Sequence, residues 1–189
     1  MNPGGASGPE AAAPAPELPP LPKLWIGYLL GVATVVAEHV ALALHPELAQ
    51  GTMGPPLYLF LVNFVGSVYW LACIHRYHAA LAGVPGWQHP ISPAKAVGYH
   101  FIPVYSLYWL FKWPIEVAKF VNATFAKPVM KSTPVGVAFA MALILCFFDP
   151  GMGLLFLFLP LSYISECLRR AFALRQQRLA DVPSDDEGS

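Results

Sequence analysis

Three polar side chains inside apolar stretches are the first residues of this chain that can do chemistry: Glu38, His39 and Asn63. Glu38 and Asn63 lie at similar distances, roughly 10 Å, from the connection between two successive apolar stretches. A carboxyl group in hydrocarbon is costly and normally faces a partner inside a helical bundle. The pattern therefore predicts an intramembrane polar site, which either moves protons or cations or clamps two helices by hydrogen bonds. We favour the clamp.

A second group of candidates is histidine. His75 and His78 are three residues apart on one helical face, a spacing that can ligate one metal ion, and His100 is expected near the same membrane surface. The chain has no HExxH motif, no cysteine ligand and no carboxylate pair to complete such a site. Histidines at a membrane interface beside Arg and Tyr are the commoner outcome, so we predict no metal, no haem and no other cofactor.

No pattern in the sequence predicts catalysis. Ser162 and Ser165 lie in an apolar stretch without a histidine, and the nucleophile motif GxSxG is absent. The glycines form neither a P-loop nor a dinucleotide fingerprint, although Gly27 and Gly31 form a GxxxG pair that permits close helix contact or dimerisation. Three cysteines lie in apolar runs without a CxxC spacing and are expected to serve packing: Cys73, Cys146 and Cys167. We predict that the protein is not an enzyme.

The composition is that of a membrane protein. The chain has 189 residues, of which 56% are hydrophobic and 12% are charged, whereas soluble domains average about 25% charged residues. The formal net charge is zero, which disfavours nucleic acid as a partner. These properties predict an all-α integral membrane helical bundle.

The elements that position the polar residues are four predicted membrane spans and a re-entrant segment. The spans are residues 24–44, 57–75, 133–148 and 154–168. The last two belong to one apolar region that would be about 50 Å long as a single helix, too long for one crossing. Asp149-Pro150-Gly151 divides that region with strong turn residues, and Pro160 is expected to kink the second leg.

Between these spans lies a segment of mixed character. Ser92 and Pro93 favour a helix start, residues 96–111 carry no charge, and Pro103 interrupts them. From residue 112 to 127 apolar residues recur at helical spacing opposite charged ones, which predicts an amphipathic interfacial helix. Four aromatic residues are expected to anchor it at the membrane interface: Tyr105, Tyr108, Trp109 and Trp113.

The same segment carries a resemblance to a known group of proteins. The run SPAKAVGYHFIP, residues 92–103, followed by the aromatic patch, resembles a segment of small bacterial membrane proteins classed as domains of unknown function. The resemblance covers Ile91 to about Trp113. It implies a bacterial membrane protein with several helices, and it implies no activity, because those families have no established catalytic residues.

The positive charges predict the topology, because Lys and Arg collect on the cytoplasmic side. If the N-terminus is inside and residues 96–111 dip in and return, every Lys and Arg is cytoplasmic and only Glu47 and Asp149 remain in the outer loops. If residues 96–111 cross fully, at least four lysines fall outside. We therefore predict a bacterial inner-membrane protein with both termini in the cytoplasm.

The membrane domain is expected to span residues 23–178. A Pro- and Ala-rich tail, residues 1–22, and an acidic tail, residues 179–189, are expected to be disordered. Ala41-Leu42-Ala43 resembles a signal-peptidase site, but the preceding region is long and Pro-rich, which disfavours cleavage.

These features predict a non-enzymatic component that binds or scaffolds a partner. The helix at 112–127 and the basic C-terminal helix would face lipid or another subunit, with the lipid bilayer, a membrane protein or a second copy as partners. The alternative is a small oligomeric transporter or channel that uses Glu38 and Asn63, and a membrane enzyme is a third possibility.

Overall fold

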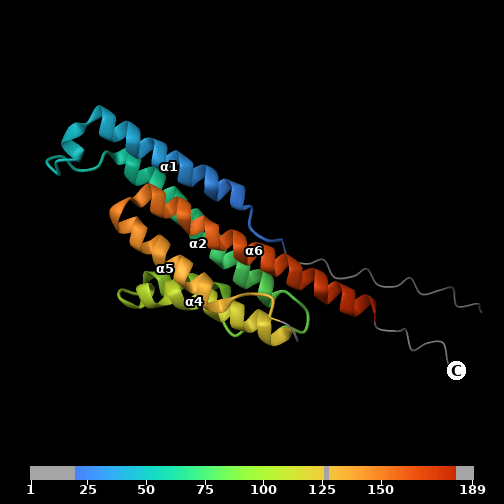
Figure 1. Cartoon of the computed structure of the whole chain (residues 1–189). Coiled ribbons are helices and arrows are strands. Elements are labelled where there is room, and N and C mark those ends of the chain that lie inside the picture. The colour runs from blue at the N-terminus through green and yellow to red at the C-terminus, as the bar shows by residue number, and fades with distance from the viewer. Residues whose placement is uncertain (1–19, 126–127, 182–189) are drawn as a thin grey trace, which may run out of the picture.

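The protein is described by a computed structural model. The structure describes residues 20–125 and 128–181, so most of both predicted tails and the end of the predicted 112–127 helix lie outside the described residues. Within these ranges the fold is all-α, with six α-helices and two short 3-10 helices (Figure 1). In order these are α1 (Leu24–Leu44), η1 (Pro46–Leu48), α2 (Leu57–Ala82), α3 (Pro93–Gly98), η2 (Tyr99–Phe101), α4 (Tyr105–Thr124), α5 (Ser132–Phe148) and α6 (Pro150–Ala180).

Two helical hairpins form the body of the molecule, α1 with α2 and α5 with α6 (Figure 1). Helix α6 contacts α1, α2, α4 and α5 and is therefore the central element. Three helices, α1, α2 and α6, are long and apolar enough to cross a membrane. Helix α5 is apolar but has only 17 residues, about 26 Å, slightly less than the roughly 30 Å of hydrocarbon.

Helix α1 packs tightly on α6 because its facing residues have no side chain. A Cβ on Gly27 would overlap the ring of Phe158, and a Cβ on Gly31 would lie 2.9 Å from the Cα of Leu155. The GxxxG pair is thus used for close packing within the chain. Two hydrogen bonds secure the same contact, since the hydroxyl of Tyr28 lies 2.7 Å from the Ser162 hydroxyl and donates to the Phe158 carbonyl at 3.1 Å.

The predicted turn between the last two apolar legs is present, but its second leg is longer than predicted. The Asp149 carboxylate accepts the Met152 N–H at 2.8 Å and caps α6, with Pro150 in the first turn. The helix then continues for 31 residues, about 46 Å. The predicted leg, residues 154–168, and the predicted basic C-terminal helix are thus parts of one helix, which continues through Pro160. Helix α2 likewise continues beyond residue 75 to Ala82.

The middle segment is broken at Pro103, as its sequence predicts. Helix α3 ends at Gly98 and η2 ends at Phe101, and α4 begins at Tyr105 after Val104, a β-branched residue with a φ of 64°. The predicted boundary at residue 112 is wrong, because α4 is one helix from Tyr105 to Thr124 and Pro114 lies inside it. Whether this segment dips into the membrane stays a prediction.

The apolar stripe of α4 is covered by protein. Trp109, Trp113, Val117 and Val121 are buried in the main core, and the Trp113 ring packs on Phe139 of α5 with ring centroids 5.1 Å apart. Hydrophobic spacing identifies the face of a helix that avoids water, but it does not distinguish a lipid surface from a neighbouring helix. The amphipathic pattern is therefore accounted for by packing within the bundle.

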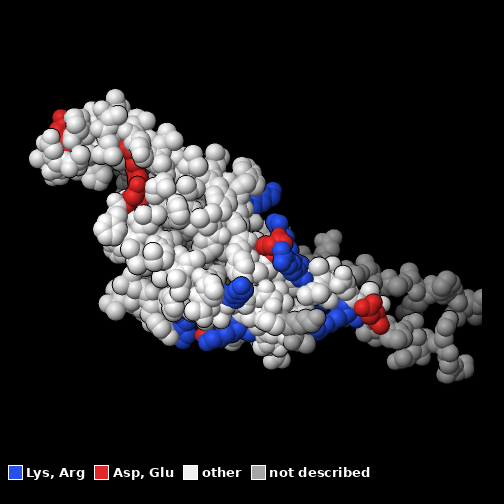
Figure 2. All heavy atoms as spheres, in the orientation of Figure 1, with Lys and Arg blue, Asp and Glu red and all other residues white. Residues whose placement is uncertain are grey.

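Positive charges gather on one part of the surface. Figure 2 shows Lys and Arg over the lower and right parts of the molecule, whereas the upper left end shows only acidic side chains. The sequence explains this separation, because residues 24–75 and 132–168 contain no Lys or Arg. We call the end that carries Glu38, Glu47 and Asp149 the acidic end.

Candidate functional site

The polar site predicted at Glu38 lies at the acidic end, where α1 meets the start of α6. The Glu38 carboxylate accepts the N–H of Gly151 at 3.0 Å, beside the Asp149 cap. The first N–H groups of a helix have no partner within it, and the helix dipole favours negative charge there. Two carboxylates from different parts of the chain thus satisfy one helix start, and Glu38 joins α1 to α6.

The other two members of the predicted polar site bond to their own helices. The Asn63 amide lies beside Glu38 but donates to the Leu59 carbonyl at 3.2 Å. His39 is exposed, and its Nδ1 lies 2.8 Å from the Val35 carbonyl oxygen. Glu38, His39 and Asp149 line an open cavity of about 400 Å³. The geometry is that of an interhelical clamp beside an open cavity.

A buried group of ring nitrogens forms the second candidate site, which we call the imidazole–indole cluster. Its members are Trp70, His78, His89, His100 and Trp113. His78 Nδ1 lies 2.7 Å from His89 Nε2, and the His78 ring lies 6.0 Å from the Trp113 ring. The Trp70 ring meets the His100 ring edge-on at 5.1 Å.

The cluster holds unused hydrogen-bonding capacity. Each of its five residues has one buried side-chain nitrogen without a hydrogen-bond partner, and within the described residues no other buried side-chain nitrogen or oxygen shares this condition. Such groups are costly when left unpaired in a protein interior. The cluster therefore carries an energetic cost within the core, which its aromatic packing must offset.

Burial disfavours the protonated form of two of the imidazoles. It lowers the pKa of His89 to about 4, and it lowers the pKa of His100, against a smaller opposing effect of the Ala96 carbonyl that its Nδ1 contacts at 2.9 Å. Within residues 20–125 and 128–181, no three His, Cys, Asp or Glu side chains are grouped so that they could hold a metal ion.

The cluster differs from the predicted histidine group in one member. His78 and His100 belong to it, but His75 is exposed and does not. His89 takes its place, and sequence reasoning missed it because it lies in the connection between α2 and α3, where no periodicity applies. The serines considered as nucleophiles hold helices together, since Ser165 lies 2.6 Å from the Tyr77 hydroxyl, which also donates to Leu161.

The predicted interface anchors fall into two pairs. Trp109 and Trp113 are buried in the core, and Trp109 Nε1 donates to the Ala96 carbonyl at 2.8 Å. Tyr105 is partly exposed and Tyr108 is 52% exposed, so only this pair faces outward.

The cation-rich part of the chain is a folded unit, which we call the basic cap. It consists of the connection 83–92, helix α4 and residues 166–180 of α6. Trp87 packs against Phe120, Phe125 and Phe172, with ring centroids 5.8 to 6.0 Å apart. The guanidinium of Arg175 donates to the Pro85 carbonyl at 2.6 Å. The end of α6 is thus fixed against the other two parts of the cap.

The chain shows no match in comparisons with protein-family models, with curated proteins and with solved structures.

Proposed function

We propose that this helical membrane protein is a non-enzymatic, partner-binding component and that its basic cap binds an acidic segment of a partner membrane protein. One observation supports this proposal most: the cations of the basic cap belong to helices that are fixed to one another by side-chain contacts. Membrane orientation depends on how many Lys and Arg flank the spans, and it does not require them to be held in a fixed arrangement. Fixed charges favour recognition of a complementary surface.

The outer face of α4 is the surface that we assign to the partner. Lys112 and Lys119 are seven residues apart and share this face with Tyr108, whose ring lies 5.1 Å from the Lys112 ammonium. The only carboxylate on this face is Glu116, which pairs with Lys119 at 3.4 Å. The Lys119 side chain is 64% exposed, so this ion pair is weak and the face keeps a positive excess.

The test is affinity purification of the full chain in mild detergent, with identification of the proteins that co-purify. We expect a stoichiometric partner that is lost from the variant Lys112→Gln/Lys119→Gln and kept by Lys23→Gln/Arg76→Gln, which removes two cations outside the cap. Equal recovery of that partner with both variants, or recovery of the chain alone, would contradict the proposal.

The predicted orientation is tested separately with a cysteine at Lys119 in a chain without its natural cysteines. A membrane-impermeant thiol reagent is expected to label it only after the cells are opened. Labelling in intact cells would place the basic cap on the outer side of the membrane and overturn the predicted orientation.

The alternative function, a small oligomeric transporter, draws support from the open cavity beside Glu38 and Asp149. Glu38→Gln tests it in liposomes with the purified protein. Loss of ion flux with unchanged thermal stability would favour transport, whereas loss of stability alone would favour the clamp between α1 and α6.

A further inference from the structure

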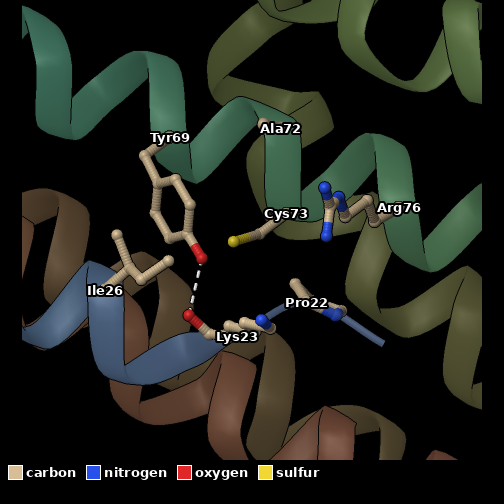
Figure 3. A pocket seen from close by; sticks show the side chains of 7 residues that line it. All are labelled: Pro22, Lys23, Ile26, Tyr69, Ala72, Cys73 and Arg76. Atoms are coloured by element: carbon tan, nitrogen blue, oxygen red, sulfur yellow. Dashed lines mark hydrogen bonds between the residues drawn. The ribbon is translucent and has the colours of Figure 1, made fainter. Parts of the chain in front are cut away.

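A cavity of about 410 Å³ lies between the start of α1 and the last turns of α2, outside the basic cap (Figure 3). Its walls combine two kinds of side chain. Lys23 and Arg76 supply positive charge, while Ile26 and Ala72 supply apolar surface. In Figure 3 the Arg76 guanidinium extends over the gap between the helices, beside the Cys73 thiol.

The two cations have no anionic partner in the part of the chain that the structure describes. The ion pairs found there are Lys119 with Glu116 and Arg170 with Glu166. Two unpaired cations from different helices that border one cavity attract an anion. A planar guanidinium and an ammonium together suit a phosphate group, which guanidinium contacts through two parallel hydrogen bonds.

The site is preformed by a bond between the two helices. The Tyr69 hydroxyl donates to the Lys23 carbonyl at 2.6 Å and fixes the start of α1 against α2. This bond uses the backbone of Lys23, so its ammonium group remains available. Fixing both walls before binding reduces the entropy cost of holding a ligand.

The place of the cavity along the helices indicates what carries the phosphate. Lys23 directly precedes the apolar helix α1, and Arg76 directly follows the uncharged run from residue 57 to 75 in α2. Both cations therefore stand where an apolar span ends, which is the level of lipid headgroups. The apolar wall of Ile26 and Ala72 continues into the surface of those spans, where an acyl chain would lie.

We propose that this cavity binds the phosphate of an anionic phospholipid, with Arg76 contacting the phosphate oxygens, Lys23 adding a second charge, and the glycerol and acyl part lying along Ile26 and Ala72. The site is independent of the partner surface on α4. The same cations would also attract free phosphate, so the experiment must separate the two sources.

The experiment measures the melting temperature of the full chain in a nonionic detergent, titrated separately with dihexanoyl phosphatidylglycerol, dihexanoyl phosphatidylcholine and inorganic phosphate. A ligand that binds only the folded state raises the melting temperature once its concentration exceeds its dissociation constant, and the rise grows with the logarithm of that concentration. We expect phosphatidylglycerol to raise it at concentrations at least tenfold below those that the other two ligands need.

The variant Lys23→Gln/Arg76→Gln is expected to need at least tenfold more phosphatidylglycerol for the same rise. The matched control Lys112→Gln/Lys119→Gln, which also removes two cations, is expected to respond like the unaltered chain. Ala72→Phe keeps both cations and fills the apolar wall, so it is expected to weaken the lipid response even if the double variant does not fold.

An equal response of the cavity variants and the control to phosphatidylglycerol would overturn the proposal. Phosphatidylcholine acting at the same concentration would show that negative charge is not recognised, and inorganic phosphate acting equally well would assign the site to free phosphate. Each of these two results would also overturn it. Loss of the partner on α4 would leave the lipid titration unchanged, so the two proposals fail separately.

Discussion

The acidic end and the imidazole–indole cluster differ in whether their polar groups have hydrogen-bond partners. At the acidic end, the carboxylates of Glu38 and Asp149 meet the free N–H groups at the start of α6. In the cluster, five ring nitrogens from α2, α4 and the connections around α3 come together, and each leaves one atom without a partner. In the first region the polar groups hold helices together by hydrogen bonds. In the second, each residue has a ring nitrogen that forms no hydrogen bond within the described chain.

This difference indicates which polar atoms stabilise the fold and which do not. A polar group that is fully satisfied by the fold acts as a clamp, so its removal costs stability. A polar group that is buried and unsatisfied contributes packing, while its unpaired nitrogen lowers stability because it has lost its hydration. The two regions therefore predict different results when the polar atom alone is removed.

The largest effect is expected in the cluster when the packing itself is removed. Trp113→Ala should lower the free energy of unfolding by about 3–5 kcal/mol, the usual cost of deleting a buried large aromatic side chain. Trp113→Phe should cost much less, because the lost indole N–H has no partner among the described residues. Denaturant titration in detergent measures both, and equal losses would show that the N–H is engaged.

An intermediate effect is expected at the acidic end. Glu38→Ala and Asp149→Ala should each lower the free energy of unfolding by about 1–2 kcal/mol, because each removes a carboxylate from the same helix start. The double variant should lose less than the sum, since neighbouring groups that share one function are not additive. Full additivity in a double-mutant cycle would show that the two carboxylates act independently.

The same clamp can be broken without changing a charge. A Cβ on Gly151 would collide with the Glu38 carboxylate. Losing one hydrogen bond to a charged group costs about 1.5–3 kcal/mol, and alanine returns up to about 1 kcal/mol of helix propensity. Gly151→Ala should therefore lower the free energy of unfolding by about 1 kcal/mol. Gly98→Ala is the control, because nothing lies within 4 Å of that position and alanine favours a helix. A loss as large at Gly98 would contradict this explanation.

A pH-dependent effect distinguishes the cluster from the acidic end. The pKa of His89 is about 4 in the folded chain because of burial, against an ordinary value of 6.5. The unfolded chain therefore binds a proton more readily between these values, so stability is fully present above pH 6.5 and falls as the pH drops towards 4.

His89→Phe should flatten this decline in thermal stability between pH 6.5 and 4. Phe120→Leu is the control, because it removes the ring that lies 4.8 Å from His89 and leaves the imidazole in place. A decline of the same slope in the His89→Phe variant would assign the pH dependence to other groups.

Much of the helical framework follows from local sequence. The predicted first span, residues 24–44, coincides with α1. An uninterrupted apolar run favours a continuous helix, and the turn residues of the connection after it mark where that helix ends. Asp149-Pro150 favours a helix start, since the carboxylate suits the cap and the proline suits the first turn. Pro103 breaks the middle segment for an equally local reason.

Local spacing did not predict that the apolar and the charged parts of α2 and α6 form continuous helices. Helices α2 and α6 continue past their apolar parts to Ala82 and Ala180, because backbone hydrogen bonds propagate a helix whether or not its side chains are apolar. Contacts such as that of Arg175 with Pro85, 90 residues apart, then hold the extension in place. Such a contact has no counterpart in local spacing.

The chain by itself determined which residues avoid water and where its turns begin, because both depend on side chains that are neighbours in the sequence. Only the tertiary structure decided what covers each apolar face. It turned Trp109 and Trp113 inward, brought His89 to His78, and placed Arg76 opposite Lys23. These pairings join segments that approach each other only after the helices have packed, so no local pattern records them.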